Sequence, residues 1–99
     1  MSMPSAFLTS QTTGHGCWPS TTICESNSTV IVEGLPAACI SHAAIPHRCV
    51  VTPHPAHGLV ISDASSSVII EGLPAARIGD SMSCGDTIAS GASNVITGD

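Results

Sequence analysis

The sequence predicts an all-β fold in which short β-hairpins form a small pseudo-threefold domain spanning residues 1–99. One segment occurs twice, as Glu33–His42 and Glu71–Asp80, and both copies contain Gly-Leu-Pro-Ala-Ala, which indicates an internal repeat. A short β-branched run precedes each copy. Proline, glycine and β-branched residues interrupt every window long enough for a helix, so short strands joined by turns fit better.

Three β-branched runs mark three repeat units. They begin at Thr29, Ser67 and Asn94 and align through a shared Val-Ile pair. The third run stops at Asp99, where the next Leu-Pro-Ala-Ala would begin, and Pro4–Ala6 looks like a worn copy of that missing piece. We therefore expect the two ends of the chain to meet and complete three units. Valine and isoleucine should face the common axis, and serine and threonine should face solvent.

Three features of the composition limit the possible functions. The net charge is −5 and the only basic residues are Arg48 and Arg77, so no basic patch for nucleic acid can form. No signal peptide and no apolar run of spanning length are present, so we expect synthesis in the cytoplasm and no stable membrane insertion. Only Phe7 and Trp18 are aromatic, and a core with so few rings usually needs a staple.

The cysteines and histidines favour a metal as that staple. The chain has five cysteines, an odd number, and five histidines. Without a secretion signal, metal binding is the stronger interpretation and a disulfide framework the weaker one. Imidazole and thiolate together suit zinc.

Three of these residues each precede a glycine and open a segment that leads to a β-branched run. They are His15, His57 and Cys84. We interpret them as one equivalent position in three repeats, although the alternative is that they are ordinary surface residues. A tetrahedral zinc shell needs a fourth ligand, for which His42 is the best candidate and His54 its main rival. The segment Ala43–Pro55, which contains three prolines, is expected to be a loop.

The letters Pro-Ala-Ala-Arg at Pro74–Arg77 resemble the signature of the PAAR-repeat family, the tips of type VI secretion spikes. The resemblance covers nearly the whole chain. It implies a cone closed near its apex by zinc, held by three histidines and one cysteine. We assign these roles to His15, His42, His57 and Cys84. The chain departs from the signature at Cys39, which stands where the motif has arginine.

The resemblance also implies a partner, a VgrG-type spike trimer, and contraction-driven puncture of a target cell envelope. A cone with its own internal threefold axis would bind one trimer as a single chain, through a broad apolar base for which Val32, Ile70 and Leu73 are candidates. The chain would assemble in the cytoplasm and be delivered extracellularly or into target cells by the secretion machine.

Two other functions are considered. A small zinc-dependent hydrolase would need three protein ligands, an open fourth position and a base such as Asp63 or Asp86. A fourth ligand closes that position, so we expect a structural protein and not an enzyme. An effector-adaptor module, which carries separate effector proteins, is the other alternative.

Overall fold

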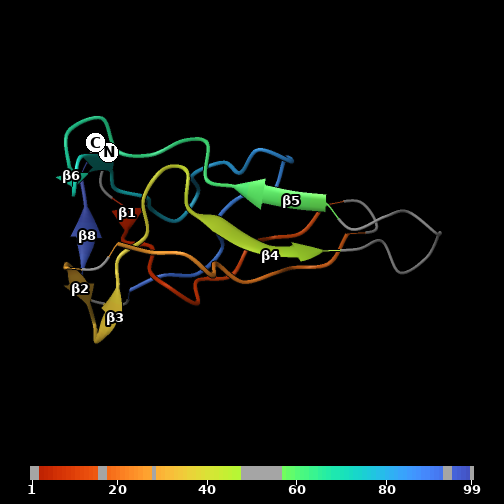
Figure 1. Cartoon of the computed structure of the whole chain (residues 1–99), viewed down its shortest axis with the longest axis horizontal. Helices are drawn as coiled ribbons and strands as arrows, with labels where there is room; N and C mark the ends of the chain where they lie inside the picture. Colours follow the sequence, from red (N-terminus) through yellow and green to blue (C-terminus); the bar gives the residue numbers. More distant parts are fainter. Residues whose placement is uncertain (1–2, 16–17, 28, 48–56, 93–94, 99) are drawn as a thin grey trace.

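The computed structural model describes residues 3–15, 18–27, 29–47, 57–92 and 95–98. This described part contains short strands and no helix, as the sequence predicts (Figure 1). The strands are β1 (Met3–Pro4), β2 (Ile31–Val32), β3 (Leu35–Pro36), β4 (Ala43–His47), β5 (His57–Val60), β6 (Ile69–Ile70), β7 (Leu73–Pro74) and β8 (Ile96–Thr97). They form two-stranded antiparallel sheets in the pairs β1–β8, β2–β3, β4–β5 and β6–β7.

Three of the pairs repeat one register. Each places an isoleucine of one strand opposite a proline of the other. The pairs are Ile31 with Pro36 in β2–β3, Ile69 with Pro74 in β6–β7, and Ile96 with Pro4 in β1–β8. The third pair joins the two ends of the chain in the register of the other two, which confirms the predicted closure.

The turns of two of these hairpins need positive φ angles. Glu33 and Gly34 have φ of 49° and 84°, and Glu71 and Gly72 have φ of 52° and 83°. Two successive residues with positive φ match the turn that follows the natural twist of a β-hairpin. Glycine takes this conformation without steric cost, which explains the Glu-Gly pair before each Leu-Pro.

A ring of alanines lies at the centre of the three repeats. The Ala6 amide donates to the Ala76 carbonyl (3.0 Å), Ala76 donates to Ala38 (2.9 Å), and Ala38 donates back to Ala6 (3.1 Å). All three residues are buried. The last residue of each of the elements 4–6, 36–38 and 74–76 therefore lies at the pseudo-threefold axis, where the backbones approach too closely for a larger side chain.

Isoleucines form the next layer of the core. Ile23, Ile61 and Ile88 are buried, and their carbonyls accept hydrogen bonds from the turn residues Thr9, Ser41 and Gly79. These three turn residues also share positive φ angles, of 82°, 74° and 92°. The interior thus consists of small and aliphatic side chains in threefold layers.

The orientation of the β-branched runs differs from the expectation that valine and isoleucine face the axis. Val32 is buried, but Ile31, Ile69 and Ile96 are exposed. Successive residues of a strand point to opposite faces, so a hairpin with two-residue strands must turn one side chain outward. Alanine and the isoleucine layer fill the axis instead.

The hairpin β4–β5 extends along the molecule, away from the three short hairpins (Figure 1). The molecule measures 39 × 25 × 21 Å, and the short hairpins gather at one end of its longest axis. The sequence-based expectation of a loop over Ala43–Pro55 was wrong for Ala43–His47, which is strand β4. The pairing is irregular between Ala44 and His47, and such an irregularity lets a strand accommodate Pro46. No helix in the described part of the chain is long and apolar enough to cross a membrane.

Candidate metal centre

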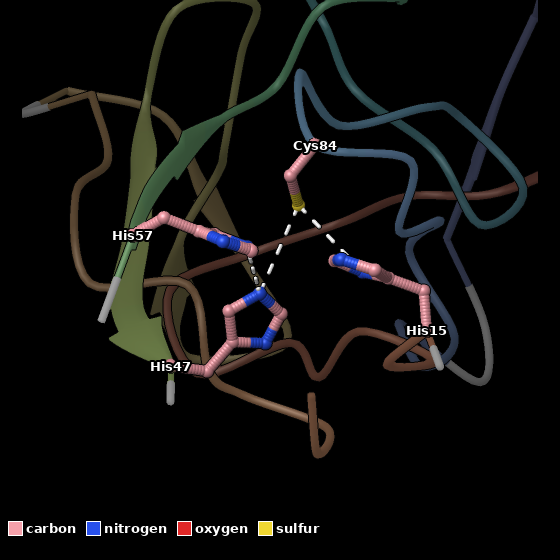
Figure 2. A group of neighbouring side chains, drawn as sticks. All are labelled: His15, His47, His57 and Cys84. Atoms are coloured by element: carbon pink, nitrogen blue, oxygen red, sulfur yellow. Dashed lines mark hydrogen bonds between the residues drawn. The ribbon is translucent and has the colours of Figure 1, made fainter. Parts of the chain in front are cut away.

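Four side chains converge at the far end of β4–β5 from the short hairpins: His15, His47, His57 and Cys84 (Figure 2). His47 ends β4 and His57 begins β5, where the two residues pair across the hairpin. His15 and Cys84 come from segments of the first and third repeats. The ligand atoms of all four lie within 4.8 Å of one another.

The separations suit a small tetrahedral metal shell. The Cys84 Sγ lies 3.9 Å from His47 Nε2, and the Nε2 atoms of His47 and His57 are 2.7 Å apart. Tetrahedral zinc with nitrogen and sulfur ligands places its donor atoms about 3.3–3.7 Å apart. The observed distances lie on both sides of that range, and three imidazoles with one thiolate form a donor set that zinc prefers. The residues therefore fit the metal that the sequence predicts.

The tautomer of His47 is fixed by a backbone contact. Its Nδ1 lies 2.8 Å from the Pro19 carbonyl oxygen, which can only accept a hydrogen bond. The Nδ1 atom must therefore carry the proton, and Nε2 keeps its lone pair directed at the other three side chains. Since His47 is buried, this contact holds the imidazole in an orientation that leaves its Nε2 lone pair available to a metal.

A carboxylate, Asp86, lies next to two of the histidines and is fully buried. It contacts His15 Nδ1, accepts a hydrogen bond from the Gly14 amide at 3.2 Å, and lies 3.9 Å from His47 Nδ1. Burial acts to raise the pKa of Asp86, but hydrogen bonds with His15 and Thr12 and the nearby imidazoles outweigh it and hold that pKa below its usual value. The group is therefore a carboxylate at neutral pH.

Aromatic packing shapes the other side of the group. Trp18 stacks on His15, with ring centroids 5.2 Å apart, and lies 5.0 Å from the ring of His57. Trp18 is thus packed against the candidate ligands and not within the isoleucine layer. The pKa of His57 is lowered by desolvation and then by the neighbouring His47 and His15. A lowered pKa favours the neutral imidazole, the form that binds a metal.

The structure brings together His15, His57 and Cys84 as expected, but it places His42 elsewhere. The Nδ1 atom of His42 accepts a hydrogen bond from the Cys39 amide at 2.9 Å. The same turn recurs in the other repeats, where Ser10 accepts from Phe7 and Asp80 from Arg77. The assignment of His42 as fourth member is therefore corrected, because this side chain caps a repeated turn beside the alanine ring. The rival candidate, His54, lies outside the described residues.

Sequence reasoning missed His47, although a signal was present. His15 follows Pro4 by 11 positions, and His47 follows Pro36 by the same 11. These two histidines therefore occupy equivalent positions on the segments that follow the elements at Pro4 and Pro36. His57 precedes Ile69 by 12 positions, and Cys84 precedes Ile96 by 12. These two residues therefore occupy equivalent positions on the segments that lead to β6 and β8. The four residues form two pairs, which corrects the expected single position shared by His15, His57 and Cys84.

The other described cysteines lie away from this group, and none of those described forms a disulfide. Cys39 is buried and Cys24 is exposed. Burial, and then the negative charge of Glu71, raise the pKa of the Cys39 thiol, so Cys39 packs as a small apolar side chain. Cys17 and Cys49 lie outside the described residues.

Comparison with protein families agrees with the fold and the site. A family model described as the PAAR motif matches residues 13–90. The chain therefore belongs to the PAAR motif family, whose members are generally structural and are associated with the spike complex of type VI secretion systems. No curated protein matches the sequence.

Proposed function

We propose that this chain is a structural tip that caps a trimeric VgrG-type spike of a type VI secretion system, with one chain on each trimer. The observation that carries the proposal is a set of exposed isoleucines at equivalent positions on three hairpins. Ile31, Ile69 and Ile96 expose 57%, 57% and 64% of their surface. The pseudo-threefold arrangement of the hairpins matches the symmetry of a trimer.

These isoleucines belong to one apolar end of the molecule. The exposed residues Val30 and Val95 immediately precede Ile31 and Ile96. We call Val30, Ile31, Ile69, Val95 and Ile96 the apolar base. Several exposed apolar side chains on neighbouring hairpins favour an interaction site, because leaving them in water costs free energy. The earlier candidates for this base are replaced, since Val32 is buried and Ile70 and Leu73 are half-buried.

The opposite end carries the candidate metal centre, and we propose that it holds one structural zinc. When bound, zinc would cross-link segments of all three repeats through His15, His47, His57 and Cys84. Cys84 packs against the edge of the isoleucine core, whereas His15, His47 and His57 pack against one another and Trp18 through their rings. A closed shell of four protein ligands is the arrangement of a structural site and leaves no position for a catalytic water.

The location of the protein follows from this proposal. The chain would bind its spike in the cytoplasm and then leave the cell with it, extracellularly or into a target cell. Rapid ejection against a cell envelope would aid puncture, and separate effector proteins could travel with the same complex. A metal-braced end would keep the leading segments from fraying.

Binding between the purified chain and a trimeric spike end tests the capping proposal. Mass measurement should give one chain for three spike subunits. Apolar contact should make the affinity depend only weakly on salt between low and high ionic strength, whereas a charged contact would weaken steeply. Three chains on each trimer, or a complex that dissociates with added salt, would contradict the single apolar cap.

Two matched variants locate the contact. Ile69→Glu places a charge in the apolar base, and Ile45→Glu places the same charge on β4, where Ile45 is similarly exposed at 52%. Ile69→Glu should abolish capping with little loss of stability, and Ile45→Glu should cap normally. Equal binding by both variants would rule out the apolar base as the contact.

A further inference from the structure

We propose that Asp86 is a positioning residue of the metal centre, which orients His15 and balances the charge of the loaded site. This inference rests on the proposed zinc site. It assigns to Asp86 a role distinct from that of a hydrolytic base, because the carboxylate is fully buried and its contacts are with His15 and the Gly14 amide.

Asp86 contacts both the ring of a candidate ligand, His15, and the backbone amide of the residue before it. One carboxylate oxygen contacts His15 Nδ1, and the other accepts a hydrogen bond from the Gly14 amide at 3.2 Å. A proton on Nδ1 held by this carboxylate leaves Nε2 as the nitrogen that His15 would offer to a metal. The carboxylate thereby holds both the ring of His15 and the residue before it. His47 lies within 3.9 Å of the same carboxylate, while its own Nδ1 is held by the Pro19 carbonyl. A partner of this kind sets ring orientation and ligand basicity.

The repeated fold does not itself require a carboxylate at this position. The Asp86 carbonyl accepts from the Met82 amide at 2.7 Å, and the Thr21 carbonyl accepts from Thr12 at 2.9 Å. In the second repeat, Leu59 pairs with Ala44 at the corresponding place. Leucine and threonine thus occupy the same backbone position in the other two repeats. The acidic side chain is specific to the repeat that also supplies Cys84.

Charge balance gives a second reason for an acidic residue. A divalent cation bound by three neutral imidazoles and one thiolate leaves one net positive charge. Asp86 is fully buried and His47 nearly so, and an unbalanced charge in such surroundings is costly. Asp86 lies next to His15 and His47 in the described part of the chain, and its one negative charge would balance the net positive charge of the loaded site.

Two substitutions separate the shape of Asp86 from its charge. Asp86→Asn keeps the size and one oxygen acceptor but removes the charge. Asp86→Leu introduces the residue that the second repeat carries as Leu59. The control is Asp80→Asn, which removes another buried carboxylate from a turn distant from the metal centre. Zinc affinity is measured by competition with a coloured chelator, and the geometry by the absorption spectrum of the cobalt-substituted protein.

Both Asp86 variants should bind zinc more weakly, by roughly 10-fold to 100-fold, and should shift the cobalt spectrum. Asp80→Asn should match the unmodified chain in both measurements. Trp18 is the only tryptophan, so its fluorescence reports metal uptake at the same site. Circular dichroism of the chelated proteins checks that each variant folds, and Asp86→Asn alone decides the outcome if Asp86→Leu does not fold.

Two results would overturn the proposal in distinguishable ways. Unchanged zinc affinity and an unchanged cobalt spectrum in folded Asp86→Asn would remove the role of Asp86 and leave the zinc site intact. An unmodified chain that takes up neither zinc nor cobalt would remove the site itself, and the role of Asp86 with it.

Discussion

His47 lies opposite His57 across the β4–β5 hairpin, and their Nε2 atoms are 2.7 Å apart. Two imidazole nitrogens at this distance must share one proton or one cation. Since the Pro19 carbonyl holds the proton of His47 on Nδ1, the Nε2 atom of His47 is the acceptor of the pair. One hairpin therefore presents two metal donors from paired positions.

His47→Ala should lose the metal, whereas His42→Ala should keep it. The first change removes a donor from the four-residue group, and the second removes only a turn hydrogen bond to Cys39. We expect a zinc content near zero for His47→Ala and near one for His42→Ala, measured by elemental analysis after purification without added metal. Full zinc content in His47→Ala would refute the assignment.

Cys84→Ala should lower thermal stability far more than Cys24→Ala. Zinc bound only to the folded state contributes directly to folding, and the thiolate is one of its four donors. A loss of at least about 2 kcal/mol would lower the melting temperature by roughly 8–16 °C in a chain of this size. Cys24 is exposed and serves as the control. A chelator should reproduce the Cys84→Ala effect in the unmodified protein, and equal melting temperatures with and without chelator would contradict it.

Ala38→Leu should destabilise the fold through the alanine ring. Ala38 is fully buried and hydrogen-bonded within the ring to Ala6 and Ala76, so added methylenes must push backbone apart. Overpacking of this kind costs roughly 1–3 kcal/mol, measurable as a lower urea midpoint. Ala89→Leu adds the same atoms at an exposed site and should leave the midpoint unchanged. Equal midpoints for both variants would show that the axis tolerates larger residues.

Deleting residues 1–7 should leave the molecule open and prone to aggregation. The deletion removes β1, the partner of β8, and also Ala6, which closes the alanine ring. The freed edge of β8 would then be available to other chains. Deleting only residues 1–2 is the control, because it spares β1. Light scattering and thermal melting should separate the two truncations, and a soluble, fully stable chain without residues 1–7 would refute the closure argument.

The sequence predicted the threefold arrangement well, because repeated sequence segments adopt the same backbone conformation. The repeated Gly-Leu-Pro-Ala-Ala predicted two matching hairpins, and the worn copy at Pro4–Ala6 predicted that the two ends complete the third. Those inferences depended on the spacing of repeated residues along the chain and not on how side chains pack. The exposure of Ile31 could not be predicted in the same way, since the run Val-Ile-Val lacks the polar alternation that distinguishes the two faces of a strand.

The metal centre was predicted in part for a related reason. His15, His57 and Cys84 stand before glycines and are conspicuous in the sequence. His47 follows Pro46, which favoured a loop, and only the pairing with His57 shows that β4 continues to it. The contact between Asp86 and His15 joins residues 71 positions apart, and no local pattern predicts such a contact.

The pairing of β1 with β8 has a consequence for how the protein is made. Met3 lies opposite Thr97, so β1 cannot complete its pairing until β8 has been synthesised. Until Ile96 leaves the ribosome, the carbonyl of Val95 cannot accept from Ser5, and the first repeat keeps an unpaired edge. Loops of this length close slowly compared with local hairpins. The first repeat of the nascent chain therefore stays open until β8 emerges, and during that interval its unpaired edge can pair with another unfinished copy.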